Sequence, residues 1–169
     1  MAKRLTWVRL LSLALDAAKG MLYLHSRSPP IAHRDLKSAN LLVDSQWHVK
    51  VADFSLSRTL ELGATSFTVV QTNPRWLAPE VLDGMPGQLP ADVWAFGTVL
   101  WELLTWRLPF EGLNTYQRTG GSGLAVPASG DLAAGAFTCY PQYVRLMQAC
   151  WCHEPAGRPQ FGAIVEQLG

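Results

Sequence analysis

The segment 91–106 constrains the fold of this chain more than any other, because it is apolar on nearly every side. Asp92, Thr98 and Glu102 are its main polar interruptions. A helix with an apolar circumference is stable in water only when other elements cover all of it. We therefore expect this segment to be a helix at the centre of the fold.

A second helix is predicted near the start of the chain, where apolar residues recur at steps of three and four. Thr6 is placed to cap this helix, and the Ser-Pro-Pro segment 28–30 ends it. Two more amphipathic helices are expected near the C-terminus. The apolar positions of the three helices are Val8, Leu11, Leu15, Ala18 and Leu22; Tyr143, Leu146, Met147 and Cys150; and Phe161, Ile164, Val165 and Leu168.

Short strands are predicted between these helices. Apolar runs occur at 31–32, 41–43 and 48–51, and turn-forming residues at 44–46 separate the last two. Residues 53–80 have no sustained period and are rich in Ser and Thr, which indicates a long functional loop. The order of elements predicts a mainly α fold with short β-hairpins.

The composition narrows the classes of partner. The 169 residues are 49% hydrophobic and only 16% charged, against a usual charged share of about 25%, so part of the surface is expected to meet a partner. The formal net charge is +1 and no long run of Lys or Arg occurs, which argues against nucleic acid and against an anionic membrane surface. No apolar run reaches the roughly 18 residues that predict a membrane span.

The three cysteines, Cys139, Cys150 and Cys152, are too few and too clustered for a disulfide framework. This pattern favours a reducing compartment, and we expect a cytoplasmic protein. Together with His153 the cysteines also raise the alternative of a zinc site. Adjacent and i,i+2 positions on a helix do not face one point, so the sequence favours no metal there.

The segment 33–40, His-Arg-Asp-Leu-Lys-Ser-Ala-Asn, is the most informative string in the chain. Taken alone, it also fits an ordinary turn with a helix cap. It resembles the catalytic loop of protein kinases, in particular the Raf-like and mixed-lineage branch of the tyrosine-kinase-like group. The resemblance implies that Asp35 accepts the proton of the substrate hydroxyl, that Asn40 binds magnesium, and that Lys37 neutralises the transferred phosphoryl group and contacts the nucleotide.

Asp53-Phe54-Ser55 follows the predicted strand 48–51, where protein kinases have Asp-Phe-Gly. The resemblance implies that Asp53 is the second magnesium ligand and holds the ion against the phosphates. Ser55 departs from the family, since glycine permits a positive φ and a side chain there can cost roughly 1–2 kcal/mol. A strand that ends in a polar turn is the alternative explanation.

The same resemblance assigns structural roles to three charged residues. Glu80 in the Ala-Pro-Glu string 78–80 is expected to pair with Arg158, and removing one partner of such a buried pair costs about 3–5 kcal/mol. Asp92 is expected to anchor the backbone of the catalytic loop from below. The alternatives are two unrelated surface charges for the pair, and for Asp92 a carboxylate stabilised by the helix dipole.

The remaining site residues also come from the resemblance. It implies that Leu42 forms the floor under adenine, although an ordinary core leucine would explain it as well. Asn73 stands where Raf-like kinases often have a Thr that contacts the catalytic Asp, and its amide can donate a similar hydrogen bond.

His33, Arg34 and Phe54 complete the expected regulatory and structural set. A phosphate on a nearby loop hydroxyl would pair with Arg34. The candidate phosphorylation sites, each otherwise a solvent-facing loop residue, are Thr65, Ser66, Thr68 and Thr72.

Taken together, the motifs predict the C-terminal lobe of a protein kinase over residues 1–169, with its catalytic loop at 33–40 and its activation segment at 53–80. The expected cofactors are ATP and Mg²⁺. The expected substrate is a protein, phosphorylated on Ser or Thr, because Lys37 resembles the Ser/Thr-specific pattern and argues against tyrosine specificity.

The sequence shows no counterpart of the N-terminal lobe of such a kinase. The Gly-rich loop over the phosphates, the strand Lys and the helix Glu that pairs with it are not found. We therefore expect an N-terminal lobe to be supplied in cis or by another protein, and the isolated chain to have no useful activity. The alternative function is a non-catalytic, pseudokinase-like binding or scaffold module, which Ser55 and the missing lobe favour.

Overall fold

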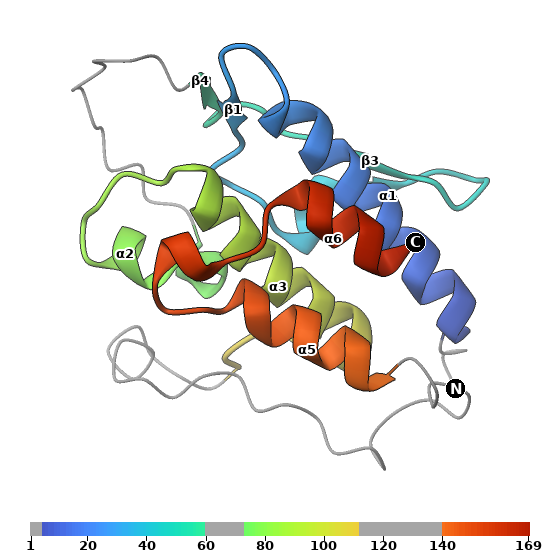
Figure 1. Cartoon of the computed structure of the whole chain (residues 1–169). Coiled ribbons are helices and arrows are strands. Elements are labelled where there is room, and N and C mark those ends of the chain that lie inside the picture. The colour runs from blue at the N-terminus through green and yellow to red at the C-terminus, as the bar shows by residue number, and fades with distance from the viewer. Residues whose placement is uncertain (1–4, 60–72, 112–139) are drawn as a thin grey trace.

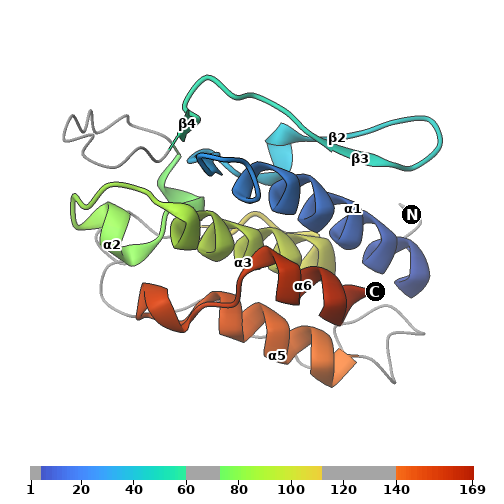
Figure 2. The same ribbon diagram turned by 45° about the horizontal axis from the view of Figure 1, so that its top comes forward.

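Four helices that run side by side form the body of the molecule (Figure 1, Figure 2). The computed structural model describes residues 5–59, 73–111 and 140–169. Its longer helices are α1 (Trp7–His25), α3 (Leu89–Thr105), α5 (Tyr140–Cys150) and α6 (Phe161–Leu168). The short elements are helix α2 (Pro79–Leu82), the 3₁₀ helices η1 (Ser38–Asn40), η2 (Pro74–Trp76) and η4 (Pro155–Gly157), and the strands β1 (Ile31–Ala32), β2 (Leu41–Val43), β3 (Val49–Val51) and β4 (Arg58–Thr59).

Helix α3 is the central helix that the sequence predicts, and it packs against both α1 and α5. It begins at Leu89 rather than at residue 91, since Pro90 is tolerated in the first turn of a helix. It ends at Thr105, and Trp106 caps it in the left-handed conformation. Its buried residues are Asp92, Val93, Ala95, Phe96, Gly97, Thr98, Val99, Leu100, Trp101 and Leu104.

Helix α1 begins after Thr6 and ends before the predicted Ser-Pro-Pro segment. The Thr6 hydroxyl accepts a hydrogen bond from the backbone N–H of Arg9 at 3.3 Å, which confirms the cap. The predicted apolar side is wrong at Val8, which is 77% exposed. Apolar residues occur on several sides of this helix, so the spacing alone does not select the side that the neighbouring helices cover. The buried residues are Leu10, Leu13, Ala14, Ala17, Ala18, Met21 and Leu24.

Helices α5 and α6 complete the core against α3 and α1. The ring of Phe161 on α6 meets the ring of Phe96 on α3 edge-on, with the centroids 5.3 Å apart. The buried Tyr143 hydroxyl donates to the carbonyl oxygen of Leu100 at 2.8 Å, which supplies the partner that a buried polar group needs. The apolar positions predicted for both helices are confirmed, with Val165 partly buried and the others fully buried.

Two short antiparallel sheets of two strands each lie on the same side of the helical body, and Figure 2 shows β2 and β3 above α1. Strands β2 and β3 form a hairpin, whereas β1 and β4 are distant in the sequence. Asp44 closes the turn between β2 and β3, because its Oδ1 accepts from the backbone N–H groups of Gln46 and His48, both at 2.9 Å. The strands predicted at 31–32 and 41–43 are confirmed, whereas the third begins at Val49. Strand β4, which pairs with β1, was not predicted.

A mainly helical fold with few, short strands is therefore confirmed in the part of the chain that the structure describes, where one strand pair, β2–β3, is a hairpin. No helix of this part is long and apolar enough to cross a membrane. The four candidate phosphorylation sites between residues 65 and 72, and Cys139, lie outside the described residues.

Helix α3 packs so closely on the end of α5 that Gly97 leaves no room for a side chain. A Cβ atom on Gly97 would lie 2.7 Å from Cys150 Cβ, whereas a Cβ atom on Gly162 of α6 would meet nothing within 4 Å. We expect Gly97→Ala to lower the free energy of unfolding by about 1–3 kcal/mol through overpacking. Gly162→Ala should raise it by up to about 1 kcal/mol, because alanine is the better helix former. Urea unfolding followed by circular dichroism measures both, and equal effects would contradict this packing.

Candidate functional site

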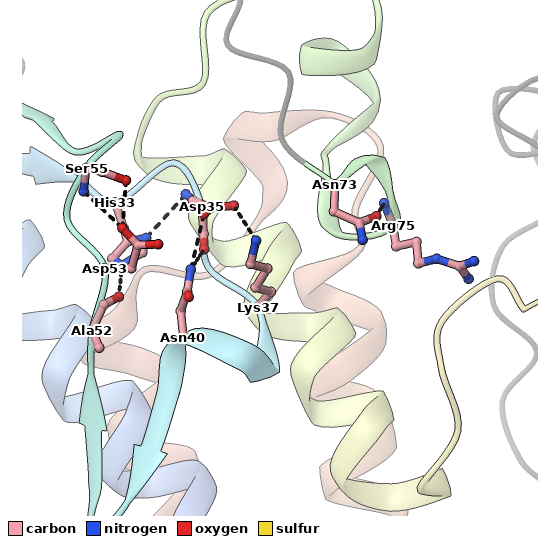
Figure 3. A network of polar contacts seen from close by, with 9 residues as sticks. All are labelled: His33, Asp35, Lys37, Asn40, Ala52, Asp53, Ser55, Asn73 and Arg75. Carbon is pink, nitrogen blue, oxygen red and sulfur yellow. Dashed lines mark hydrogen bonds and ion pairs between the residues drawn. The ribbon is translucent and has the colours of Figure 1, made fainter.

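The carboxylate of Asp35 lies at the centre of a polar cluster formed by the segment 33–40 (Figure 3). The ammonium group of Lys37 is 3.4 Å from Asp35 Oδ1. The side-chain amide of Asn40 donates to Asp35 Oδ2 at 3.2 Å and to the backbone oxygen of Asp35 at 2.7 Å. Helix η1 turns the chain back on itself, so that Asn40 closes the loop onto Asp35.

The buried imidazole of His33 joins this loop to the segment that leads into Asp53. Its Nδ1 accepts from the backbone N–H of Asp35 at 3.2 Å, and its Nε2 lies 3.0 Å from the carbonyl oxygen of Ala52. An N–H needs an acceptor and a carbonyl oxygen needs a donor, so the two partners assign the tautomer with the proton on Nε2. The Ala52 N–H also donates to the backbone oxygen of Asn40 at 2.8 Å. These ties place Asp53 beside the cluster, as Figure 3 shows.

Asp53 itself has a left-handed backbone, with φ of 61°. The Ser55 hydroxyl donates to Asp53 Oδ1 at 2.6 Å, and the Ser55 backbone N–H donates to the same oxygen at 3.3 Å. These bonds, with a smaller contribution from the charge of Lys37, hold the pKa of the Asp53 carboxyl below its usual value. The prediction of backbone strain at Ser55 is wrong, because the residue of this turn with a positive φ is Asp53.

Two oxygens of the cluster have the chemistry that Mg²⁺ prefers. Asn40 uses Nδ2 for both of its bonds to Asp35, and Asp53 uses Oδ1 for both bonds from Ser55. Among the residues that the structure describes, Asn40 Oδ1 and Asp53 Oδ2 accept no hydrogen bond. Amide and carboxylate oxygens are hard ligands that suit this ion. The donor chemistry of the two side chains therefore fits a magnesium ion.

A buried carboxylate, Asp92, holds the backbone of the 33–40 loop. Its Oδ2 accepts from the His33 N–H and its Oδ1 from the Arg34 N–H, both at 2.8 Å. His25 Nε2 lies 2.8 Å from the same Oδ2. Arg34 has φ of 70°, a conformation that costs a non-glycine residue roughly 1–3 kcal/mol and persists only with such support. The anchoring contact expected from the sequence is present, whereas nothing in the sequence pointed to His25.

Glu80 and Arg158 form the ion pair that the sequence predicts. Nη1 and Nη2 of Arg158 donate to the two Glu80 oxygens at 2.7 and 2.8 Å. The Arg158 side chain is fully buried and also donates to the backbone oxygens of Cys152 and Pro90, and its guanidinium lies 5.1 Å from the ring centre of Trp94. The alternative of two unrelated surface charges is therefore wrong.

The structure also describes three further residues that the sequence analysis predicted for the site: Leu42, Phe54 and Asn73. Leu42 is 57% exposed, so the alternative of an ordinary core leucine is wrong, and its place under adenine stays a prediction. Phe54 is half-exposed, with its ring centroid 5.5 Å from that of His33. Asn73 Oδ1 accepts from the backbone N–H of Arg75 at 3.2 Å as the cap of η2. Within the described residues Asn73 makes no hydrogen bond to the loop carboxylate, so the expected contact is replaced by this cap.

Two of the three cysteines lie in the described part of the chain, Cys150 buried and Cys152 partly exposed. Burial raises the pKa of the Cys150 thiol to about 12. In the three described stretches of the chain, no group of three or more His, Cys, Asp or Glu side chains is arranged to hold a metal ion.

Comparison with known proteins adds independent information. The family model for protein tyrosine and serine/threonine kinases matches residues 1–168. The chain is 43% identical over 165 residues to the serine/threonine-protein kinase CTR1 of Arabidopsis thaliana, and the matched region covers 95% of this chain and 19% of that protein. It is 43% identical over 169 residues to the probable serine/threonine-protein kinase drkC of Dictyostelium discoideum, covering 97% of this chain and 22% of that protein. It is 42% identical over 159 residues to the serine/threonine-protein kinase STY17 of Arabidopsis thaliana, covering 94% and 27%. The chain thus spans well under a third of the length of these relatives.

The bond from the Ser55 hydroxyl is the largest cause of the low pKa of Asp53, so Ser55→Ala should move that pKa up toward its usual value. Ser55→Thr keeps the hydroxyl and should leave the pKa low. A carboxyl whose pKa is lower in the folded state stabilises the fold above its unfolded pKa, and this contribution is lost as the pH falls through the folded pKa. The decrease in the free energy of unfolding that Asp53 causes as the pH falls should therefore be smaller in Ser55→Ala than in the wild type.

Carbon-13 NMR titration of the Asp53 carboxyl measures the shift in all three proteins. An identical pKa in the wild type and in Ser55→Ala would show that the hydroxyl bond is absent in solution.

Proposed function

The chain belongs to the protein tyrosine and serine/threonine kinase family, in its tyrosine-kinase-like group, and from this premise we propose that it is the catalytic-lobe part of a Ser/Thr protein kinase. The reaction proposed for the complete protein transfers the γ-phosphoryl group of ATP to a Ser or Thr hydroxyl of a protein. The observation that carries the proposal is the meeting of Asp35, Asn40 and Asp53 in one cluster (Figure 3).

Each side chain of the cluster has a distinct task in this proposal. Asp35 is the acceptor for the proton of the substrate hydroxyl. The Asn40 amide holds this residue in place, with one bond to its carboxylate and one to its backbone oxygen. Lys37, whose ammonium lies 3.4 Å from that carboxylate, supplies positive charge where the phosphoryl group passes. Asn40 Oδ1 and Asp53 Oδ2 are the metal-binding oxygens, and the ion supplies neutralisation of the phosphate charge when it is bound.

The substrate class and the partners follow from the same residues. Lys37 resembles the Ser/Thr-specific pattern, and the relatives above are named serine/threonine kinases. Leu42 and Val43 on β2, the strand that follows Asn40, and Phe54, which follows Asp53, are all at least half exposed. This exposure supports a further lobe, in cis or from another protein, that covers them and completes the nucleotide site. A cytoplasmic location remains part of the proposal, on the strength of the cysteine pattern.

A non-catalytic binding or scaffold module is the second candidate. The Ser55 hydroxyl already occupies Asp53 Oδ1, which leaves one oxygen of that carboxylate for a metal ion. The exposed apolar residues beside the cluster would serve equally well as a docking surface. The two candidates differ in whether phosphoryl transfer occurs once the upper lobe is present.

A chimaera that joins the N-terminal lobe of the CTR1 kinase domain to this chain separates the two candidates. We expect it to transfer radiolabelled phosphate from ATP to Ser or Thr of a generic protein substrate, and the chain alone to show no useful turnover. Asp35→Asn in the chimaera should lower the rate by about 10²–10⁴, because the proton acceptor is lost. Asp83→Asn changes an exposed carboxylate of the same size and should leave the rate unchanged.

A chimaera that is folded by circular dichroism but inactive, beside an active CTR1 kinase domain, would contradict the proposed activity and favour the binding module. Phosphotyrosine as the main product would contradict the proposed substrate class. An Asp35→Asn chimaera with the parent rate would exclude Asp35 as the proton acceptor.

A further inference from the structure

Glu102, in the last turn of α3, joins two segments that are remote from each other in the sequence. Its Oε1 accepts from the Ser38 hydroxyl at 2.7 Å, and its Oε2 accepts from the indole N–H of Trp76 at 2.8 Å. Ser38 belongs to the 33–40 loop, between Lys37 and Asn40. Trp76 is the last residue of η2, in the segment 73–80 that ends at the Glu80–Arg158 pair. One carboxylate therefore holds both segments, one with each oxygen.

The surroundings of Glu102 favour these two hydrogen bonds, which together form a bridge between Ser38 and Trp76. Trp76 is buried, so its indole N–H needs an acceptor that water does not readily supply. Glu102 lines an apolar groove with Leu41 and Leu103, and burial raises the pKa of its carboxyl although the bonds from Trp76 and Ser38 oppose this. Across the described residues, no hydrogen bond or ion pair joins the segment 73–80 directly to the segment 33–40.

The carboxylate is a rigid, planar group, so its two oxygens move together. A rotation that keeps the bond to Trp76 also displaces the oxygen that Ser38 holds. Ser38 begins η1, and the same helix carries Asn40, whose amide donates to the carboxylate and to the backbone oxygen of Asp35. A displacement of Trp76 thus has a continuous path of bonded groups into the polar cluster.

We propose that Glu102 is a positioning residue that couples the segment 73–80 to the 33–40 loop, so that the placement of Trp76 sets the placement of Asn40 and Asp35. The coupling concerns the folded chain alone and needs neither nucleotide nor metal. Its regulatory meaning rests on the proposed function, because it would let the end of the activation segment adjust the catalytic loop.

The test is a double-mutant comparison by ¹H–¹⁵N NMR on the chain as it stands. Trp76→Phe removes the indole donor and keeps a buried aromatic ring. We expect it to shift the backbone amide signals of Ser38, Ala39 and Asn40 in the wild-type background, and to shift them at least threefold less in the Glu102→Ala background. The direct ring-current change is common to both backgrounds, so it cancels in the difference between the two shifts, and this difference measures the transmitted part.

Two further variants distinguish the bridge from a general loosening of the fold. Glu102→Gln keeps an oxygen for Trp76 and an N–H₂ that Ser38 Oγ can accept from, so it should restore most of the transmitted shift. Glu166→Ala removes an exposed glutamate from helix α6 and should leave the transmission at its wild-type size.

Ser38→Ala keeps the test decisive if Glu102→Ala fails to fold, because Ser38 is exposed and its loss opens no cavity. It should reduce the shift transmitted to Asn40 as strongly as Glu102→Ala does. Equal transmitted shifts with and without Glu102, or with and without the Ser38 hydroxyl, would overturn the proposal. Such a result leaves the proposed phosphoryl transfer untouched, since the chimaera measures that separately.

Discussion

Asp92 is a buried carboxylate on the central helix, and the arrangement of the polar cluster depends on the hydrogen bonds it accepts. Two of them come from the consecutive backbone N–H groups of His33 and Arg34. Arg34 lies in the left-handed region, which the chain avoids unless its surroundings hold it there. Because helix α3 is packed on all sides, Asp92 is a fixed point from which the whole 33–40 loop is positioned.

Asp53 and Ser55 are held in the cluster by hydrogen bonds between the segment that precedes them and the 33–40 loop. His33, held by Asp92, bonds to the carbonyl oxygen of Ala52, and the N–H of Ala52 bonds to the backbone of Asn40. These contacts bring Asp53 next to Asp35 although the two residues belong to different loops. Ser55 then orients the Asp53 carboxylate through the bond to Oδ1. The departure from the family at this position therefore acts on the carboxylate and adds no left-handed residue.

A feature of the fold or of the site could be predicted from the sequence when a local pattern or motif determines it, and not when contacts between distant parts of the chain do. The central helix was predictable because a wholly apolar segment has to be covered on every side. The partners of Glu80 and Asp92 were predictable from family resemblance, because their motifs stand in the family's order. The exposure of Val8 was not, since α1 carries apolar residues on several sides and only tertiary packing selects among them. The bond from His25 to Asp92 joins distant parts of the chain, and no local pattern encodes it.

Amide hydrogen exchange of His33 and Arg34 tests most directly whether Asp92 holds the loop. Asp92→Asn preserves the shape of the side chain but leaves one acceptor oxygen in place of two. A hydrogen bond to a charged group contributes about 1.5–3 kcal/mol, so at least one of the two amides should exchange tenfold or more faster in the variant, while the amides of α5 and α6 keep their protection. Unchanged protection of both amides would contradict the account.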